Sequence, residues 1–265
     1  MKKYLVVGAG GTGSEILKIL CSSNSAITVI DYDKIEISNL CRQFYYSEND
    51  VNEFKAEIIA KRLHVNYKVC YIDEIDAGYF DQFDVIFSCV DNLTARMQIN
   101  YLFRLSKCQM MIDMGVEGLK MHVKKVTKES ACLYCIKDLF NTNNLPFLCS
   151  LSGKIAVTEL NREKMLKSTV LSHKNGKTAE EIVEIFNNSV NNDRYKTNLF
   201  EVKGIYEEIV PNVSFINSIC ASFAILMIYD QDHDYLFYNG EQKVYLSKQN
   251  IEKDEECIVC KLNKD

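Results

Sequence analysis

The segment Gly8–Gly13 constrains the fold of this chain more than any other short stretch. It reads Gly-Ala-Gly-Gly-Thr-Gly and fits the pattern G-x-G-x-x-G. An apolar, strand-like run at Tyr4–Val7 precedes it, and the following residues, Ser14–Ser22, carry apolar side chains at helical spacing. Glycines let the backbone approach a phosphate group, and the N-terminus of the next helix offers unpaired N–H donors to that anion. The expected nucleotide contacts of this loop are Gly8, Gly10, Gly11 and Gly13.

Asp31 follows the second β-branched run of the chain, Ala26–Ile30. An acidic side chain about 20 residues beyond such a glycine loop accepts hydrogen bonds from the ribose hydroxyls of a nucleotide. The loop and the acid fit an NAD-dependent oxidoreductase as well as an ATP-dependent enzyme. A tight strand–helix turn without any ligand is the remaining alternative for the loop itself.

Strand-like and helix-like segments continue to alternate after Asp31. In order along the chain we expect a helix at Glu53–Leu63, strands at Val69–Ile72 and Asp84–Val90, a helix from about Leu93 to Leu105, and a strand at Met110–Asp113. Such alternation favours an α/β fold with a Rossmann-like, doubly wound and mainly parallel sheet.

The pattern changes after Cys135. A polar loop spans residues 141–144, and a helix is expected at Ala179–Asn187. Thr178 and Glu181 form a capping-box pattern at the start of that helix. A small, mostly helical module is therefore expected to interrupt the main domain.

We expect the chain to divide into three segments. Residues 1–140 form the first part of the main domain, 141–203 form the inserted module, and 204–265 return to the main domain. The return segment carries an apolar helix through Ile219–Ile228 and a β-hairpin signal at Asn239-Gly240.

Composition and charge argue against several classes of partner. The net charge is −5 and no long basic tract occurs, so nucleic acid is not an expected partner. The apolar stretches Tyr4–Val7 and Ile219–Ile228 are too short to span a bilayer, so no membrane partner is expected. The eleven cysteines lack the spacing of a small secreted disulfide framework, and the N-terminus does not read as a signal peptide. A reducing compartment, the cytosol or the nucleus, is therefore expected.

Three stretches beyond the glycine loop resemble the ubiquitin-activating superfamily, which includes the bacterial sulfur-carrier adenylyltransferases. Asp31–Phe44 reads Asp-Tyr-Asp-Lys-Ile-Glu-Ile-Ser-Asn-Leu-Cys-Arg-Gln-Phe and resembles the family pattern D-x-D-x-I-x-x-S-N-L-x-R-Q-F. Phe54-Lys55-Ala56 resembles the family's K-A element, and Asp91–Asn100 resembles its D-N-x-x-A-R-x-x-(I/V)-N element. Gly115–Gly118 falls where the family has a short, glycine-containing strand end. The resemblance covers essentially the whole chain and favours ATP over NAD.

The resemblance implies an adenylation reaction in which a carboxylate attacks the α-phosphate of ATP. Two anions meet in that step, so fixed positive charge must surround the phosphates, and Arg42 and Lys55 are the residues expected in that catalytic role. Asp91 is expected to hold Mg²⁺, which neutralises phosphate oxygens. A surface ion cluster is the alternative for these three residues. The remaining expected nucleotide contacts are Asp31 at the ribose, with Asn39 and Gln43 completing the pocket.

Two C-x-x-C pairs, Cys132–Cys135 and Cys257–Cys260, have the spacing of zinc-knuckle ligands. The separation between the pairs is not that of a zinc finger, but many members of the resembled family carry two such pairs. In those members the pairs join the middle of the domain to its C-terminal end. We expect a structural Zn²⁺ held by all four cysteines. Four ordinary cysteines are the alternative, and a redox pair fits less well because neither follows a thioredoxin-like pattern.

Cys149 is the candidate nucleophile, within the segment Leu145–Ser150. In the heterodimeric activating enzymes for SUMO or for the modifier attached to cullins, a thioester-forming cysteine follows the first C-x-x-C in a P-x-C-T setting. Here Pro146 stands three residues before the cysteine rather than two, and Ser150 replaces the threonine. The proline-containing run and His-Cys pair that often follow in the family are missing from Gly153–Lys164. A buried structural cysteine is the alternative.

These features together predict the catalytic subunit of an activating enzyme for a ubiquitin-like protein. The expected steps are adenylation of the modifier's C-terminus, thioester formation on Cys149 and transfer to a conjugating enzyme. A non-catalytic second subunit is expected, because the chain begins at its first strand without a helix that brings an extra phosphate-binding arginine. No ubiquitin-fold domain follows Cys260, so the conjugating enzyme would be recruited in another way. The rivals are a sulfur-carrier adenylyltransferase and a non-catalytic scaffold subunit.

Overall fold

The computed structural model describes residues 1–140, 162–173, 176–190, 193–199, 201–202, 214–240 and 244–262. The chain divides into two compact units, one formed by Met1–Thr142 with Asn212–Asp265 and the other by Asn143–Pro211. The first division falls close to the one expected after residue 140. The second falls at Pro211 rather than at residue 203.

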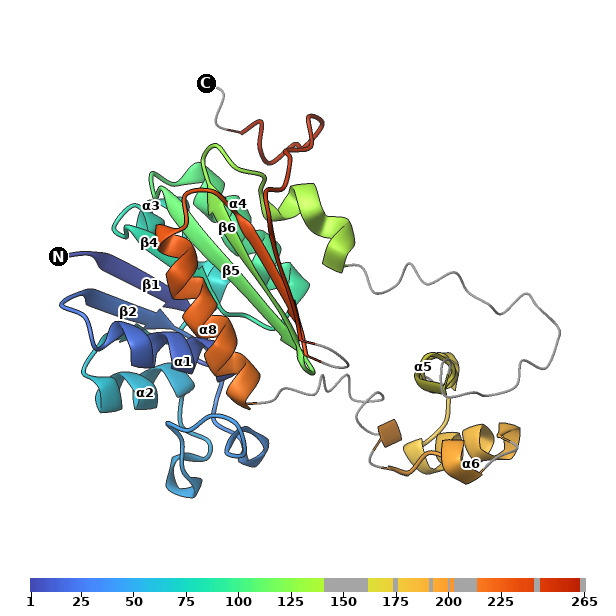
Figure 1. The fold of residues 1–265 in the computed structure, drawn as a ribbon. Coiled ribbons are helices and arrows are strands. Elements are labelled where there is room, and N and C mark those ends of the chain that lie inside the picture. Colours follow the sequence, from blue (N-terminus) through green and yellow to red (C-terminus); the bar gives the residue numbers. More distant parts are fainter. Residues whose placement is uncertain are drawn as a thin grey trace. The chain divides into compact units, whose positions relative to one another are not determined.

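The first unit is built on one eight-stranded sheet (Figure 1). Its strands are β1 (Lys3–Val7), β2 (Ala26–Ile30), β3 (Asn66–Lys68), β4 (Val85–Ser88), β5 (Met110–Glu117), β6 (Lys120–Thr127), β7 (Tyr235–Asn239) and β8 (Tyr245–Gln249). The spatial order is β3-β2-β1-β4-β5-β6-β7-β8. The first five strands pair in parallel, and β6, β7 and β8 extend the sheet in antiparallel fashion. The predicted Rossmann-like, mainly parallel α/β fold is confirmed.

Helices cover both faces of this sheet, which makes the fold doubly wound (Figure 1). Helices α1 (Gly11–Leu20), α2 (Lys55–Leu63) and α8 (Ser214–Tyr229) share a hydrophobic core with one face. The other face packs against α3 (Ala77–Phe80), α4 (Leu93–Leu105) and the 3₁₀ segment η4 (Leu133–Phe140). Shorter 3₁₀ turns are η1 (Ile37–Asn39), η2 (Glu48–Asp50) and η3 (Ile72–Glu74). Helix α8 packs along α1, so the return segment reaches the helix that follows the glycine loop.

The residues of β1 show why the parallel strands read as continuous apolar runs. Tyr4 and Val6 belong to the core on the α1 side, whereas Leu5 and Val7 belong to the core on the α4 side. A strand covered on both faces has no polar face to alternate with. The carboxyl ends of β1, β2 and β4 then meet at one edge, which is where open α/β sheets bind ligands.

The strand expected at Val69–Ile72 is wrong. Strand β3 lies earlier, at Asn66–Lys68, and Ile72 instead begins η3. All three residues of β3 are exposed because it is the outermost strand beside β2. An exposed edge strand needs no apolar side chains, so the apolar pattern pointed to the wrong residues.

Strand β6 was not expected, because lysines interrupt its apolar pattern. The side chain of Lys124 is fully buried and its Nζ lies 2.5 Å from Asp234 Oδ2, a pairing that the local sequence does not reveal. Strand β6 pairs with β5 along its whole length, so β5 runs to Glu117 instead of ending at Asp113. Gly115 is therefore an interior strand residue, and Gly118, with a φ of +58°, makes the turn. The strand end at Asp113 is wrong, but β5 does end within the expected glycine-containing stretch Gly115–Gly118.

The return segment follows its prediction more closely. Helix α8 contains the expected apolar stretch, and β7 and β8 form the expected antiparallel hairpin. Asn239 pairs with Tyr245, so the connection is longer than the Asn239-Gly240 pair alone. None of the helices in the described ranges is long and apolar enough to cross a membrane.

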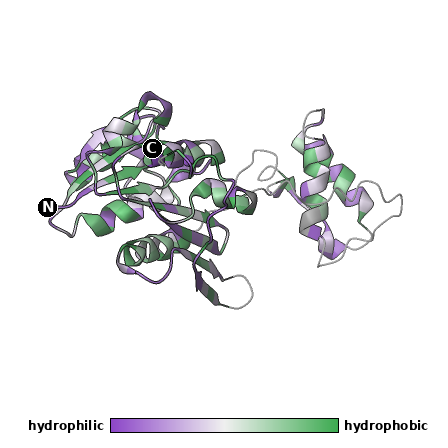
Figure 2. Ribbon diagram, turned by 90° about the horizontal axis from the view of Figure 1, so that it is seen from above, coloured by the Kyte–Doolittle hydropathy of each residue, from purple (hydrophilic) through white to green (hydrophobic). Residues whose placement is uncertain are grey.

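The described part of the second unit is helical. It contains α5 (Arg162–His173), α6 (Ala179–Ser189) and the 3₁₀ turn η6 (Asp193–Tyr195). The capping box of Thr178 and Glu181 is confirmed at the start of α6. These helices carry both hydrophobic and hydrophilic residues (Figure 2). The hydrophobic ones form a small core of Leu166, Val170, Ala179, Ile182, Phe186, Val190 and Val202.

Candidate nucleotide and zinc sites

The glycine loop lies between β1 and α1, against the end of β4. Gly8 has a φ of +98°, and a Cβ there would lie 2.6 Å from the carbonyl oxygen of Cys89. A Cβ on Gly13 would lie 1.9 Å from the carbonyl oxygen of Gly8, so both positions need glycine. Helix α1 begins at Gly11, and Gly10 supplies no side-chain cap. The first N–H groups of α1 are therefore placed to meet an anion.

Asp31 is held directly against this loop. Its Oδ2 accepts a hydrogen bond from Ala9 N at 2.6 Å, and its Oδ1 accepts one from Asp33 N at 2.7 Å. Burial raises the pKa of Asp31, and the charge of Lys55 works against that rise. Each carboxylate oxygen has a second lone pair that remains for a ribose hydroxyl. The structure thus places this acid where the glycine-loop pattern predicted it.

Lys55 lies at the start of α2 and is largely buried. Its Nζ lies 2.8 Å from Asp33 Oδ2, and its backbone N–H donates to the carbonyl of Asp33. The predicted phosphate-binding lysine is therefore beside Asp31. In the ligand-free chain its charge is balanced by a carboxylate that the sequence reasoning did not single out.

Tyr46 connects the glycine loop to the segment after η1, and the sequence patterns did not predict this contact. The side chain is buried, and its hydroxyl donates to the carbonyl oxygen of Ala9 at 2.7 Å. Burial, followed by the charge of Asp31, raises the pKa of Tyr46 well above its usual range, so the hydroxyl remains a donor. Tyr46 thereby fixes the segment after η1 to the glycine loop. A single tyrosine in a polar stretch carries no pattern that predicts this contact.

The other predicted nucleotide residues lie on the segment around η1. Asn39 is buried, and its Oδ1 accepts a hydrogen bond from Glu36 N at 3.1 Å, which shapes the turn. Gln43 is buried next to the loop, since its Nε2 lies 3.9 Å from the Cβ position of Gly10. Arg42 is half-buried and donates to the carbonyl of Ser38 at 2.6 Å. The role of Arg42 and Lys55 as a pair of phosphate-binding cations stays a prediction.

Asp91 follows the end of β4 and is exposed. Partial burial, followed by the charges of Asp33 and Asp91, raises the pKa of Tyr32, which shows that both carboxylates act on one side chain. A cluster of carboxylates near a phosphate site is suited to Mg²⁺, which takes oxygen ligands. Asp91 and Asp33 are the residues that would hold that ion.

Asp113 anchors both ends of the loop that carries Asp91. Its Oδ1 accepts from Ser88 Oγ at the end of β4, and its Oδ2 accepts from Arg96 Nη1 in the first turns of α4, each at 2.7 Å. His122 Nε2 lies 3.3 Å from the same Oδ2. Burial alone would raise the pKa of Asp113, but Arg96 and His122 hold it below its usual range. The family-like A-R element already contained Arg96, but only the fold reveals its partner.

Replacing Asp113 with asparagine is expected to lower the free energy of unfolding by about 3–5 kcal/mol, because it leaves the buried Arg96 guanidinium without its counter-charge. Chemical denaturation of the variant measures this. Glu57→Gln, which breaks an exposed pair with Lys61, is the matched control and should change stability little. Equal stabilities of the two variants would show that the buried pair does not hold the loop.

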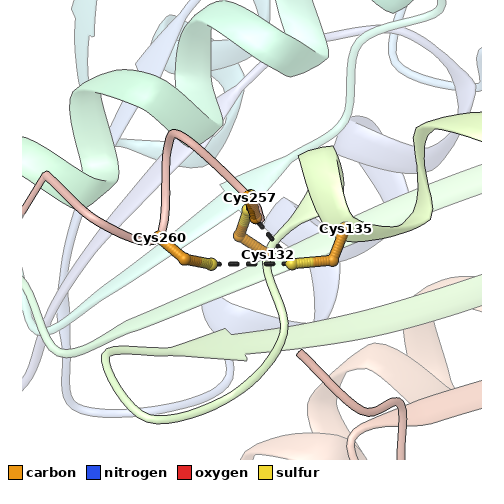
Figure 3. A group of neighbouring side chains, drawn as sticks. All are labelled: Cys132, Cys135, Cys257 and Cys260. Atoms are coloured by element: carbon orange, nitrogen blue, oxygen red, sulfur yellow. Dashed lines mark hydrogen bonds between the residues drawn. The ribbon is translucent and has the colours of Figure 1, made fainter. Parts of the chain in front are cut away.

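The four cysteines of the C-x-x-C pairs come together in space (Figure 3). Their sulfur atoms all lie within 4.8 Å of one another, with Cys132–Cys257 and Cys135–Cys260 both at 3.6 Å and Cys132–Cys135 at 3.9 Å. These distances are too long for disulfides. They match the edge of a tetrahedron, about 3.8 Å for a Zn–S bond of about 2.3 Å. The geometry is compatible with the predicted structural zinc site.

The zinc-compatible cluster joins two distant parts of the first unit. Cys132 and Cys135 lie at the start of η4, and Cys257 and Cys260 lie in the segment after β8 (Figure 3). Arg104 Nη2 lies 3.5 Å from Cys260 Sγ, so a cation faces the sulfur that would be a thiolate. The remaining predicted site residue, Cys149, lies outside the described residues.

The model of the ThiF family matches residues 1–230. The chain belongs to the ThiF family. The predicted membership of the ubiquitin-activating superfamily is thereby confirmed.

Relatives of this ThiF-family chain include subunits of activating enzymes. The "NEDD8-activating enzyme E1 catalytic subunit" of Dictyostelium discoideum is 29% identical over 98% of this chain and 69% of that protein. The protein of the same name from Saccharomyces cerevisiae is 26% identical over 97% of each chain. The "SUMO-activating enzyme subunit 2" of Dictyostelium discoideum is 35% identical, over 50% of this chain and 22% of that protein. The chain spans about two thirds of the Dictyostelium NEDD8-activating subunit.

Solved structures support the fold. The crystal structure of E. coli MccB with ATP aligns with a TM-score of 0.62 at 17% identity, over 98% of this chain and 66% of that one. A structure of the same protein with MccA-N7isoASN gives the same TM-score at 18% identity. At this identity the likeness concerns the architecture of the chain.

Proposed function

We propose that this ThiF-family chain is the catalytic subunit of an activating enzyme for a ubiquitin-like modifier. It uses Mg-ATP to adenylate the C-terminal carboxylate of the modifier, forms a thioester on Cys149, and passes the acyl group to a conjugating enzyme. The observation that carries the adenylation step is the buried Asp31 bonded to the glycine loop, with Lys55 beside it. The relatives named NEDD8-activating catalytic subunits, which match nearly the whole chain, support the modifier as the substrate.

The proposed first step joins a carboxylate to the α-phosphate. A carboxylate oxygen forms a bond to the α-phosphorus while the bond to pyrophosphate breaks. Asp31 orients the ribose, and Lys55 turns from Asp33 towards the phosphate charge that develops. Arg42, which is half-buried and donates to the carbonyl of Ser38, turns to the same phosphates. Asp91, and Asp33 once Lys55 has turned away, would hold Mg²⁺, which would supply further charge neutralisation at the phosphate oxygens.

The proposed second step needs a thiolate. The sulfur of Cys149 attacks the acyl carbon, a C–S bond forms, and the C–O bond to AMP breaks with its electron pair leaving on AMP. A thiolate of the conjugating enzyme then takes the acyl group in the same way. The free thiols of the described residues fit the proposed cytosolic or nuclear compartment, where cysteines stay reduced.

A second, non-catalytic subunit is the proposed partner of the first unit. Exposed aromatic and aliphatic side chains occur on α8 and on the segment after η1: Phe44, Phe215, Leu226 and Tyr229. Phe44 and Phe215 line the same hollow, so they offer one apolar surface for such a subunit.

The experiment that tests the proposal is a thioester assay. The chain, a candidate second subunit and tagged NEDD8, SUMO or ubiquitin are incubated with Mg-ATP and separated on non-reducing gels. We expect an adduct that disappears with dithiothreitol and is absent from Cys149→Ala, which keeps modifier-dependent ATP–pyrophosphate exchange. Cys41→Ala, which removes an exposed cysteine of the first unit, should keep the adduct.

The other outcomes separate the rival functions. Exchange without any adduct would contradict the thioester step and favour an adenylyltransferase of the sulfur-carrier type. Absence of exchange with every modifier and second subunit would favour a scaffold subunit. An adduct that persists in Cys149→Ala would place the nucleophile on another cysteine.

A further inference from the structure

Two buried carboxamides beside the glycine loop have polar atoms without hydrogen-bond partners. The side chain of Asn217 on α8 is fully buried, and within the described residues neither its Nδ2 nor its Oδ1 has a partner. Gln43 is 4% exposed, and its Oε1 also lacks a partner there. Folded proteins rarely leave such atoms unpaired, because each costs roughly 1–3 kcal/mol in lost hydration. Unpaired buried polar atoms of this kind point to a ligand-binding role for the two side chains.

Both carboxamides face the N-terminus of α1. An ideal Cβ on Gly11, the first residue of α1, would lie 2.4 Å from Asn217 Nδ2. The corresponding atom on Gly10, the N-cap, would lie 3.9 Å from Gln43 Nε2. At Gly11 the carboxamide of Asn217 therefore occupies the space that a side chain would need, which brings it against the first turn of α1. The three contributing segments are the glycine loop, the residues after η1 and the return helix α8.

Asn217 lies on the buried face of α8, where an asparagine is poorly suited to a purely structural role. The other buried residues of this helix are Ile216, Cys220, Ala221, Ala224 and Met227. An apolar side chain of similar size would pack there without leaving any polar atom unpaired. Asn217 is the exception on the buried face, and it occurs at the level of the glycine loop.

The ligand that suits this place is an anion. The N-terminus of α1 carries a partial positive charge and unpaired N–H donors. A hollow of about 560 Å³ lies along the side of α1, and its lining includes Arg42, Gln43 and Ser218, the residue after Asn217. Lys18 also lines it, paired with the carboxylate of Glu15. Arg42 and the carboxamide of Gln43 thus border a hollow that reaches the residue next to Asn217.

We propose that Asn217 is a nucleotide-binding residue whose Nδ2 donates a hydrogen bond to a phosphate oxygen of ATP at the N-terminus of α1. The inference rests on the proposed adenylation function and adds a contact from the return segment to those of the first part of the chain. The Oδ1 atom is then placed to accept from a water that hydrates the same phosphate. Gln43, whose Nε2 lies near Gly10, contributes a second carboxamide to the same phosphate site.

The test compares ligand-free stability with ATP binding. Asn217→Leu should leave the thermal midpoint of the ligand-free chain unchanged or raised, because it removes two unpaired polar atoms from the interior. The same substitution should weaken Mg-ATP binding by roughly 10–100-fold in calorimetric titration, the effect of losing a hydrogen bond to a charged group. Asn217→Ala, which cannot overfill the site, should weaken ATP binding similarly.

The matched control is Asn100→Leu on α4. Asn100 is also fully buried, and its Nδ2 likewise lacks a partner within the described residues, but its Oδ1 accepts a hydrogen bond from Leu133 N at 3.0 Å. Its replacement should lower the thermal midpoint and leave ATP affinity unchanged. Asn217→Leu is thus expected to weaken ATP binding without lowering the thermal midpoint. Asn100→Leu is expected to lower the thermal midpoint without weakening ATP binding.

Two results would overturn the inference, and they differ from failure of the proposed function. If Asn217→Leu and Asn217→Ala bind Mg-ATP as tightly as the unsubstituted chain, Asn217 does not contact the nucleotide. If both variants lower the ligand-free midpoint as Asn100→Leu does, Asn217 has a structural role. If the unsubstituted chain itself binds no Mg-ATP, the proposed adenylation function fails, and the inference fails with it.

Discussion

Replacing Lys55 with methionine is expected to slow modifier-dependent ATP–pyrophosphate exchange by about 10²–10³-fold, the usual effect of removing one charge-stabilising donor from a transition state. The Lys55 ammonium is the cation that the structure places beside Asp31 and Asp33. Methionine keeps the apolar stem that packs at the start of α2, so the variant should fold. The exchange rate is measured with the modifier that forms the adduct.

Lys61→Met is the matched control for this prediction. Lys61 lies on the same helix and pairs with Glu57 at the surface, so its replacement should leave exchange unchanged. Equal rates for the two variants would contradict the proposed role of Lys55.

A pH profile gives the Lys55 prediction a second readout. Asp31 must be ionised to accept the ribose hydroxyls, burial already raises its pKa, and Lys55 opposes that rise. Loss of Lys55 should therefore raise the pKa of Asp31 further, and the loss of nucleotide binding on acidification should begin at a higher pH. An unshifted profile would show that Lys55 does not act on Asp31.

Replacing Cys257 with serine is expected to reduce bound zinc from about one ion per chain to almost none, because a structural zinc site needs all four thiolates. The segment after β8 should then detach from η4, since Cys132 and Cys257 connect the two parts. Metal analysis measures the zinc. Hydrogen exchange should show lost protection in residues 131–137 and 251–262, with β1, β2 and β4 still protected.

The control for the zinc prediction is Cys220→Ala. Cys220 is fully buried on α8 and lies outside the cluster, and burial raises the pKa of its thiol to about 12. Its replacement removes packing and should keep the zinc. Zinc retained by Cys257→Ser, or absent from the unsubstituted chain prepared without chelator, would contradict the assignment of the site.

Much of the first unit could be predicted because its signals are local. The apolar run of β2 ends at Ile30 as expected, and α4 spans Leu93–Leu105 as expected. Each of these elements is either buried on both faces or amphipathic, so the spacing of apolar residues within the element itself indicates a strand or a helix. Strands β3 and β6 were not predicted, for opposite reasons. Strand β3 has no apolar pattern because its residues are exposed. Strand β6 contains a buried lysine, Lys124, whose partner Asp234 lies far along the chain.

The candidate site was predictable in its residue types and only partly in its arrangement. The glycine loop, Asp31 and Lys55 lie together as the patterns indicated, and the four cysteines converge. The turn at η1 directs the Arg42 side chain to the carbonyl of Ser38, a partner that the motif did not indicate. A motif records which residues occur, but the rotamers and partners of exposed side chains depend on the ligand.

By itself, the sequence determined a parallel βα core with a glycine loop, an acid at the end of the next strand, and two cysteine pairs. Local periodicity and residue spacing carry that information, because they reflect contacts within one element and its immediate neighbours. Only the tertiary structure shows that Asp113 bonds to both ends of the loop that carries Asp91. It also shows that Tyr46 donates a hydrogen bond to Ala9 and that Asn217 packs against Gly11. Those contacts join residues far apart in the chain, and their geometry is set by how whole helices and strands pack.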